Sequence, residues 1–234
     1  MAIGAINTGG QQSSVKRKRL RELDFDILAL SETHLQRRLE KAEQEVFKKY
    51  WCFWGPNPEA RHFGGVAIFA KKEAFWAAKP LQFPTDHPCH AFYQDNRLIA
   101  VQVWFGRGGT SLIVYSLYGI SGSRWETHKK AYLHKLLKSI ELDRIARGQI
   151  PCVLLGDFNL EIAESQVLSQ ALSSNFWYDL RTIGDKDNQQ KATCSKGQGS
   201  YIDHIFVSPA LFDQCFNFQV RKFKEFKDHS VLVG

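Results

Sequence analysis

The chain has 234 residues, with 31 Lys and Arg against 24 Asp and Glu, so its formal net charge at pH 7 is +7. Its length suits one domain, its hydrophobic content of 44% excludes a disordered tail, and it holds no apolar run long enough to span a bilayer. The basic balance favours a polyanionic partner, and five scattered cysteines without a CxxC spacing indicate free thiols and exclude a disulfide framework.

Short β-rich runs recur along the whole chain, and they are joined by a few helical patterns. The predicted strands are Ala2–Ile6, Ile27–Leu30, Val66–Ala70, Leu98–Trp104, Ser111–Leu117, Cys152–Leu155, Tyr201–Val207, Phe216–Val220 and Ser230–Val233. The predicted helices are Lys16–Leu23, Leu35–Phe47, Trp125–Arg147 and Glu164–Leu172, and Gly148 stands where a helix C-cap belongs. This order predicts an α+β fold in which two sheets pack face to face with helices outside.

Four segments, SETH, LLGDFN, SYIDHIF and KDHS, join apolar runs to polar side chains where a strand stops. These side chains are Glu32, Asp157, Asn159, Asp203, Asp228 and His229. A strand that ends in a carboxylate delivers its oxygens to the rim of a sheet, where loops build sites. Hard oxygen ligands suit Mg²⁺, or Mn²⁺, and an imidazole adds a titratable group. The pattern therefore predicts metal-assisted hydrolysis of a phosphate ester.

Each segment taken alone has a simpler interpretation. Glu32 can open the next helix as an N-cap or surface acid, and Asp157 with Asn159 can form an Asx-type turn after a tight turn at Gly156. An acid beside a histidine is common, so Asp228 alone is weak evidence. By contrast, a carboxylate embedded in an apolar strand is costly unless it is paired or functional, which favours a role for Asp203.

Taken together, the segments resemble the endonuclease/exonuclease/phosphatase superfamily, which contains DNase I, exonuclease III-type apurinic endonucleases and the endonuclease domains of LINE-type retrotransposons. The resemblance runs from INTGG through SETHL, GGVAIF, VYSLYG, LLGDFN, ATCS and SYIDHI to DHS. It implies a single DNase I-like domain over residues 1–234, with four α/β/β/α layers and mixed sheets. SETHL followed by GGVAIF is most similar to the retrotransposon branch, so we expect a monomeric domain excised from a longer polypeptide, tethered there to a reverse transcriptase, and a nuclear location.

The resemblance also implies a role for each site residue. Glu32 looks like the principal metal-binding carboxylate, helped by Asn7, and Asp228 like a second metal or water ligand. The bound ion would be Mg²⁺, with Mn²⁺ as an alternative. The implied catalytic residues are Asp157 for the attacking water, Asn159 and Tyr118 for the scissile phosphate, Asp203 to orient the imidazole, and His229 to stabilise the developing charge.

Three departures and several basic residues bear on the substrate. Lys227 replaces the usual Ser before the terminal Asp-His, Gly9 stands where many relatives carry Asn or Asp, and Ser31 replaces a common Gln. The predicted substrate-binding residues are Thr193, Arg17, Arg19, Arg124 and Lys227. The two arginines of the first helix can also form a solvated face. Trp125 suits base stacking, but we interpret it as the first core residue of its helix.

The leading hypothesis is a Mg²⁺-dependent endonuclease that nicks DNA. Two alternatives stay open: an apurinic-site repair nuclease or another phosphoesterase of the same fold, and a catalytically impaired nucleic-acid-binding module. The first alternative keeps the chemistry and changes the substrate, whereas the second follows from the lysine at position 227.

Overall fold

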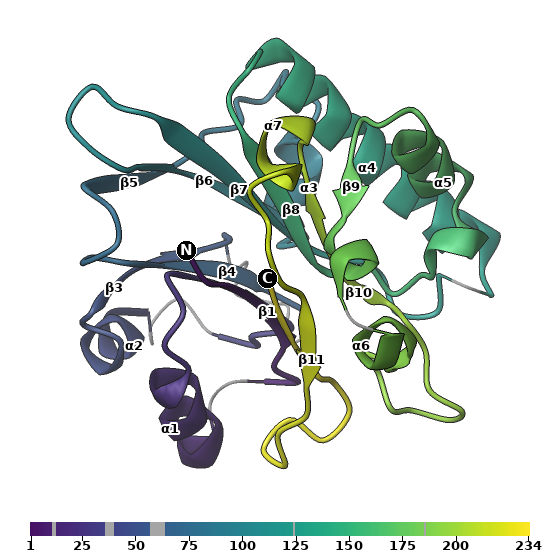
Figure 1. Cartoon of the computed structure of the whole chain (residues 1–234), viewed down its shortest axis with the longest axis horizontal. Coiled ribbons are helices and arrows are strands. Elements are labelled where there is room, and N and C mark those ends of the chain that lie inside the picture. The colour runs from purple at the N-terminus through teal and green to yellow at the C-terminus, as the bar shows by residue number, and fades with distance from the viewer. Residues whose placement is uncertain (11–12, 36–39, 57–63, 124, 185) are drawn as a thin grey trace.

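The computed structural model describes residues 1–10, 13–35, 40–56, 64–123, 125–184 and 186–234. Two six-stranded sheets pack face to face (Figure 1). The first sheet consists, in spatial order, of β11 (Gln219–Arg221), β12 (Val231–Val233), β1 (Ile3–Asn7), β2 (Ile27–Ser31), β4 (Val66–Lys71) and β3 (Tyr50–Trp54). The second consists of β5 (Ala77–Pro80), β6 (Leu98–Trp104), β7 (Ser111–Tyr118), β8 (Cys152–Asp157), β10 (Asp203–Val207) and β9 (Tyr178–Asp179).

Both sheets are mixed. β1 and β2 are parallel in the first sheet, as β7 and β8 are in the second, and the other pairs are antiparallel. The α-helices are α1 (Ser14–Glu22), α2 (Glu40–Val46), α3 (His90–Gln94), α4 (Thr127–Ala146), α5 (Gln166–Ser173), α6 (Lys186–Gln190) and α7 (Pro209–Phe212). Short 3₁₀ turns, η2 (Ile162–Glu164) and η3 (Leu180–Ile183), complete the described elements. None of the described helices combines the length and the apolar character that crossing a bilayer requires.

The layers follow from strands that are buried on both faces. In β2, Ile27 and Ala29 belong to the core between the sheets, whereas Leu28 and Leu30 join the core on the side of α1. In β8, alternate residues divide in the same way between the central core and the core beneath α4. Strands with two buried faces read as continuous apolar runs, which is why the sequence predicted them. The predicted α+β, four-layer sandwich is confirmed.

The element boundaries differ from the predictions in a few places. The helix predicted at Leu35–Phe47 is shorter, because Leu35 lies outside it and the described helix begins at Glu40. Three strands were not predicted at all, namely β3, β5 and β9. The long helix α4 lies within the predicted range, and Gly148 follows its end with a φ of +70°.

The tight turn predicted at Gly156 is wrong, because β8 continues through it to Asp157. Gly156 has a φ of +140°, and a Cβ built there would lie 2.0 Å from the carbonyl oxygen of Leu117 on β7. A glycine is therefore required by the close approach of two parallel strands next to the site, and not by a chain reversal.

We expect Gly156→Ala to lower the free energy of unfolding by about 3 kcal/mol or more, since both the backbone conformation and the space at this position exclude a side chain. Chemical denaturation of purified protein measures the change. The matched control is Gly106→Ala, where a Cβ meets no atom within 4 Å. Equal unfolding curves for the two variants would contradict the account of this contact.

Candidate active site

The strand order of the first sheet gathers several predicted residues at one edge. β1 ends at Asn7, and its parallel neighbour β2 ends just before Glu32, so the two side chains lie at the same end of the sheet. β12 is antiparallel to β1, so the residues before its start, among them Asp228 and His229, return to that same edge. Residues from both ends of the chain therefore meet.

The second sheet contributes the remaining groups at the same end of the sandwich. Tyr118 and Asp157 are the last residues of the parallel strands β7 and β8 and are partners in register. Asp203 is the first residue of the antiparallel strand β10 and lies directly opposite Asp157. The prediction that this strand begins at Tyr201 is wrong. The strand begins at Asp203, so this carboxylate stands at the first position of the strand and not in its interior.

Asn7 connects the two sheets. Its Nδ2 donates a buried hydrogen bond of 2.7 Å to Asp157 Oδ2, and its amide also helps to lower the pKa of the Glu32 carboxyl. The amide oxygen of Asn7 accepts the backbone N–H of Gly9 at 2.9 Å. One amide of the first sheet thus fixes a carboxylate of the second sheet and lies beside Glu32, which is the convergence that the strand-end pattern predicted.

His229 balances two buried carboxylates. Its Nδ1 lies 3.0 Å from Asp203 Oδ2, and its Nε2 lies 4.0 Å from Asp157 Oδ2. Burial opposes a charged imidazole, but the charge and hydrogen bond of Asp203 outweigh it and raise the pKa of His229 to about 11. Burial, together with the charge of Asp203, raises the pKa of Asp157. Since carboxylates directly opposite each other on paired strands repel, the imidazolium is what allows both to be buried here.

Glu32 presents a carboxylate that is ionised at neutral pH. Its Oε1 lies 3.5 Å from His34 Nε2, and this interaction holds the pKa of Glu32 at about 2 in spite of burial. The φ angles of Glu32 and His34 are +53° and +50°, a conformation that costs free energy in residues with side chains. The alternative interpretation of Glu32 as a helix N-cap is wrong, because the next described helix begins only at Glu40.

Arg97 connects Asn159 with Tyr118 through the carbonyl group of Gly119. Asn159 Nδ2 donates to this oxygen at 3.2 Å, and Arg97 NH1 donates to it at 3.0 Å. The Arg97 guanidinium also lies 4.6 Å from the centre of the Tyr118 ring. Burial raises the pKa of Tyr118 to about 12, so its hydroxyl stays protonated and can donate. Sequence reasoning missed Arg97, because nothing in its local pattern indicates this contact.

The backbone at Asp157 also forms the Asx-type turn that was the simpler interpretation of LLGDFN. The backbone N–H of Asn159 donates to Asp157 Oδ1 at 2.8 Å. The two interpretations are compatible, because the turn uses one carboxylate oxygen and the other accepts from Asn7. Together the two bonds fix the orientation of the carboxylate.

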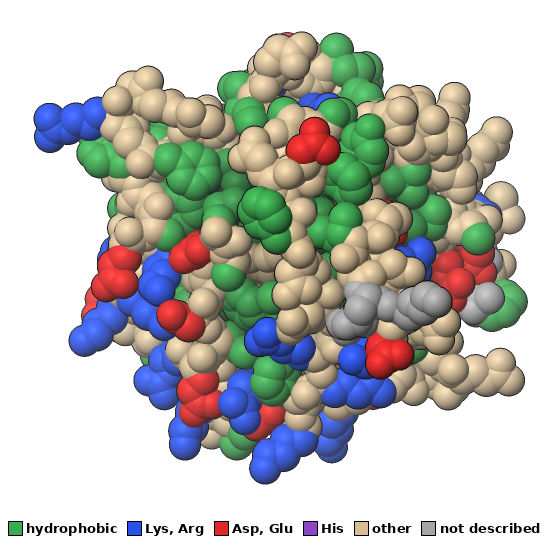
Figure 2. Space-filling model, in the orientation of Figure 1, with side chains coloured by type: hydrophobic (Ala, Val, Ile, Leu, Met, Phe, Trp, Pro, Cys, Tyr) green, Lys and Arg blue, Asp and Glu red, His purple; other side chains and the backbone are tan. Residues whose placement is uncertain are grey.

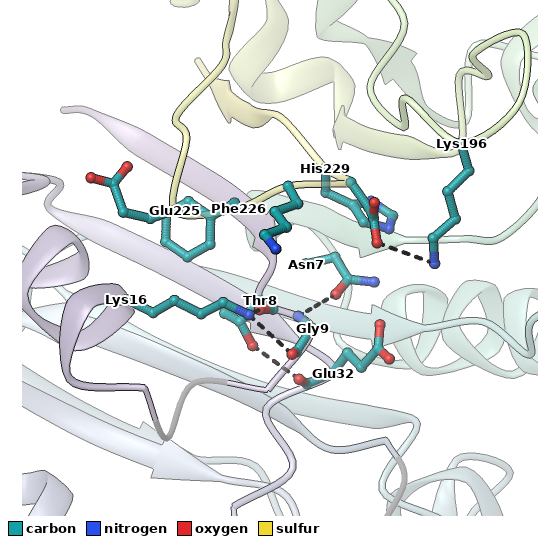
Figure 3. A pocket seen from close by; sticks show the side chains of 11 residues that line it. Asn7, Thr8, Gly9, Lys16, Glu32, Lys196, Glu225, Phe226 and His229 are labelled. Atoms are coloured by element: carbon teal, nitrogen blue, oxygen red, sulfur yellow. Dashed lines mark hydrogen bonds and ion pairs between the residues drawn. The ribbon is translucent and has the colours of Figure 1, made fainter.

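Several of these groups line a pocket of about 470 Å³ (Figure 3). Asn7, Glu32, Asp228 and His229 line it, and Lys16 and Lys196 supply ammonium groups. Lys16 Nζ donates to the carbonyl oxygens of Thr8, Gly9 and Gly10, so it ties the loop after β1 to α1. Lys16 was not predicted as a site residue. A Cβ at Gly9 would lie 3.6 Å from this ammonium, so a cation stands beside the position where many relatives carry an acid or amide.

The donor set of the pocket fits a hard divalent cation. The ionised Glu32 carboxylate, the Asn7 amide and the exposed Asp228 carboxylate offer oxygen ligands, the type that Mg²⁺ prefers. Asp157, Asp203 and His229 also offer three ligand atoms within 4.8 Å of one another. The imidazolium already offsets one of these two carboxylate charges, however, whereas Glu32 is ionised and lines the pocket, so Glu32 is the better anchor for an ion.

The predicted substrate-binding arginines are occupied by ion pairs. Arg17 NH1 lies 2.7 Å from Glu43, and Arg19 lies 2.8 Å from Glu22 and 3.1 Å from Glu225. Neither arginine lines the pocket. Arg124 lies outside the described residues, whereas Lys227 is exposed and lines the pocket.

Trp125 is not the core residue that we predicted. It precedes α4, and 80% of its surface is exposed. It follows the loop that leaves Tyr118, so a large aromatic surface lies on the segment that begins at the site.

Thr193 supports Asp203 from within the protein. Its side chain is fully buried, and its Oγ1 accepts the backbone N–H groups of Ile202 and Asp203 at 3.1 and 3.0 Å. A substrate-binding role for Thr193 stays a prediction. The contact that the structure adds is with the backbone at the start of β10, which carries one of the two buried acids.

The sequence matches the Endonuclease/Exonuclease/phosphatase family over residues 6–216. No curated protein matches it significantly. The fold is similar to that of the Xenopus laevis APE2 catalytic domain, with a TM-score of 0.75 and 18% identity over 100% of this chain and 90% of that chain. A 3'-5' exonuclease (NExo) from Neisseria meningitidis has a TM-score of 0.75 and 21% identity, over 100% of this chain and 98% of that chain. An AP endonuclease from Archaeoglobus fulgidus has a TM-score of 0.74 and 19% identity, over 100% of this chain and 98% of that chain. At such low identities the likeness to these structures shows the fold alone.

We expect Thr193→Val to lower the free energy of unfolding by about 2 kcal/mol, because it leaves two buried N–H groups without their acceptor. Thr193→Ser keeps the hydroxyl and is the matched control, with a cost of about 1 kcal/mol or less for the lost methyl group. Denaturant unfolding compares them. If the Ser variant were as unstable as the Val variant, the hydroxyl would not be the supporting group.

Proposed function

The chain belongs to the Endonuclease/Exonuclease/phosphatase family, whose enzymes hydrolyse phosphate esters with divalent metals, and on that premise we propose that it is a Mg²⁺-dependent endonuclease that nicks DNA. The observation that carries the proposal is the convergence of Glu32, Asp157 and His229 with Asn7 at one edge of the sandwich. Each of these side chains has a distinct task in the attack of water on a phosphodiester.

Glu32 and Asn7, with Asp228 nearby, would hold the cation. When bound, Mg²⁺ neutralises charge on the phosphate and polarises it as a Lewis acid. A carboxylate fixed by two hydrogen bonds, as in Asp157, orients an attacking water and accepts its proton without having to reorganise. His229 bonds Asp203 through Nδ1, which leaves Nε2 to donate to the phosphate as negative charge develops.

Tyr118 and Asn159 would hold the scissile phosphate from the second sheet. Asn159 shares the Gly119 carbonyl with Arg97, whose guanidinium also faces the Tyr118 ring, so Arg97 acts on both as a positioning residue. A shift of this group would displace both phosphate contacts together. In such a site, positioning and electrostatic stabilisation supply most of the rate enhancement.

Two features support DNA as the substrate. The net charge of +7 is that of a protein with a polyanionic partner, and Lys16, Lys196 and Lys227 line the pocket. The similarity of SETHL and GGVAIF to the retrotransposon branch supports an endonuclease tethered to a reverse transcriptase and acting in the nucleus. The names of the similar solved structures favour one alternative, a nuclease that acts at abasic sites or from 3' ends.

We expect the protein to convert supercoiled plasmid to the nicked circle in the presence of Mg²⁺, and EDTA to stop the reaction. Asp157→Asn and His229→Gln should each lower kcat by roughly 10²–10⁴-fold, since they remove the proton acceptor and the charged donor. Gel electrophoresis of time courses measures both effects. Lys79→Gln, an exposed lysine of β5, is the matched surface control.

Three outcomes would contradict the proposal in different ways. Wild-type protein that binds the plasmid without nicking it is a catalytically impaired module. Cleavage confined to duplexes with an abasic site indicates a repair nuclease, and release of mononucleotides from 3' ends indicates an exonuclease.

A further inference from the structure

A second pocket adjoins the catalytic one. It has a volume of about 310 Å³ and lies against the loop that joins β11 to β12. It is lined by Ser195, Lys222, Phe223, Lys224, Phe226, Lys227, His229 and Ser230, and we call it the β11–β12 groove. Phe226, Lys227 and His229 line both pockets, so the groove lies directly beside the catalytic pocket.

The loop beside this groove is anchored to the fold at several points. Phe226 is buried in the core on the outer side of the first sheet, and its backbone N–H donates to the carbonyl oxygen of Phe223 at 3.0 Å. Arg19 lies 5.2 Å from the centre of the Phe223 ring and 3.1 Å from Glu225 Oε1. A loop held in this way presents its other side chains with little loss of conformational entropy on binding.

The three lysines of the loop present ammonium groups that are available to an anionic ligand. Lys222, Lys224 and Lys227 are exposed, and none of them forms an ion pair with a residue that the structure describes. Arg17 and Arg19 of α1, by contrast, are paired with carboxylates. Lys and Arg side chains gather on the lower part of the face in Figure 2, where α1 and this loop lie in Figure 1.

We propose that the β11–β12 groove binds the sugar-phosphate backbone of the substrate strand next to the scissile phosphate, with Lys222 and Lys224 as phosphate contacts. This inference rests on the proposed function, because a phosphate beside His229 leads the strand from one pocket into the other. In this proposal the groove takes the place of the predicted substrate contacts of Arg17 and Arg19, and Arg19 is a positioning residue that holds the loop. Lysines that contact phosphates confer affinity and salt dependence without sequence preference.

Binding of a fluorescently labelled duplex, followed by anisotropy over a series of salt concentrations, tests the groove. The double variant Lys222→Gln/Lys224→Gln should lower the slope of log Kd against log salt by about 2, one unit for each lost phosphate contact. The control is Lys79→Gln/Lys135→Gln, which removes the same charge from two exposed lysines of β5 and α4 that line neither pocket. Its slope should equal that of wild type.

Plasmid nicking supplies the second readout. We expect the loop variant to raise KM and keep kcat, because its lysines bind the strand and do not touch the reacting atoms. Equal salt slopes for the loop variant and the control would overturn the proposal that the β11–β12 groove binds the strand, whether or not the wild type nicks DNA. Failure of the wild type to nick any DNA would overturn the proposed function alone, since the salt dependence of binding still tests whether the groove contacts the strand. Thermal unfolding confirms that both double variants are folded.

Discussion

One buried hydrogen bond, from the Asn7 amide to the Asp157 carboxylate, joins the edges of two sheets whose shared core is apolar. An unpaired amide or carboxylate buried at this depth would cost several kcal/mol, so the two groups require each other. Because Asn7 also lines the pocket with Glu32 and helps to lower the pKa of its carboxyl, the pocket depends on the packing of one sheet upon the other. The site is therefore a property of the whole sandwich and of no single strand.

The same edge also holds two buried carboxylates that repel each other, and His229 reduces this repulsion. Asp157 and Asp203 are partners across an antiparallel pair, an arrangement that repels when both are ionised. An imidazolium between them offsets the repulsion and leaves a negative cluster beside Glu32, where a cation gains from every neighbouring carboxylate. The arrangement costs stability in the free protein, as the left-handed conformation of Glu32 also does, and such costs are typical of sites built for a ligand.

The fold was largely predictable because its strands are buried on both faces. Such strands read as continuous apolar runs, and the polar residues at their ends predicted that Glu32, Asp157 and Asp203 converge at one rim of the sandwich. The short edge strands β5 and β9 escaped prediction because they present few apolar residues. Gly156 was assigned to a turn because a close approach between β7 and β8 leaves no mark in the local sequence.

The long-range contacts of the site could not be predicted in this way. Lys16 and Arg97 act through backbone carbonyl groups of other segments, and such acceptors carry no residue signature. The arginines of α1 were expected to face DNA, but their carboxylate partners come from α2 and from the loop before β12 as well as from α1 itself. Basic residues in a sequence indicate a polyanionic partner only if they are not already paired with carboxylates of the same chain. Such ion pairs can be identified only once the fold is known.

The most direct test of the central claim is a crystal structure of the protein grown with Mn²⁺, in which anomalous scattering locates the ion. The convergence of Glu32 and Asn7 with Asp157 and His229 predicts an anomalous peak inside the pocket that Asn7, Glu32 and His229 line, bound through the Glu32 carboxylate. A pocket without a peak, or an ion bound only elsewhere on the surface, would contradict the account.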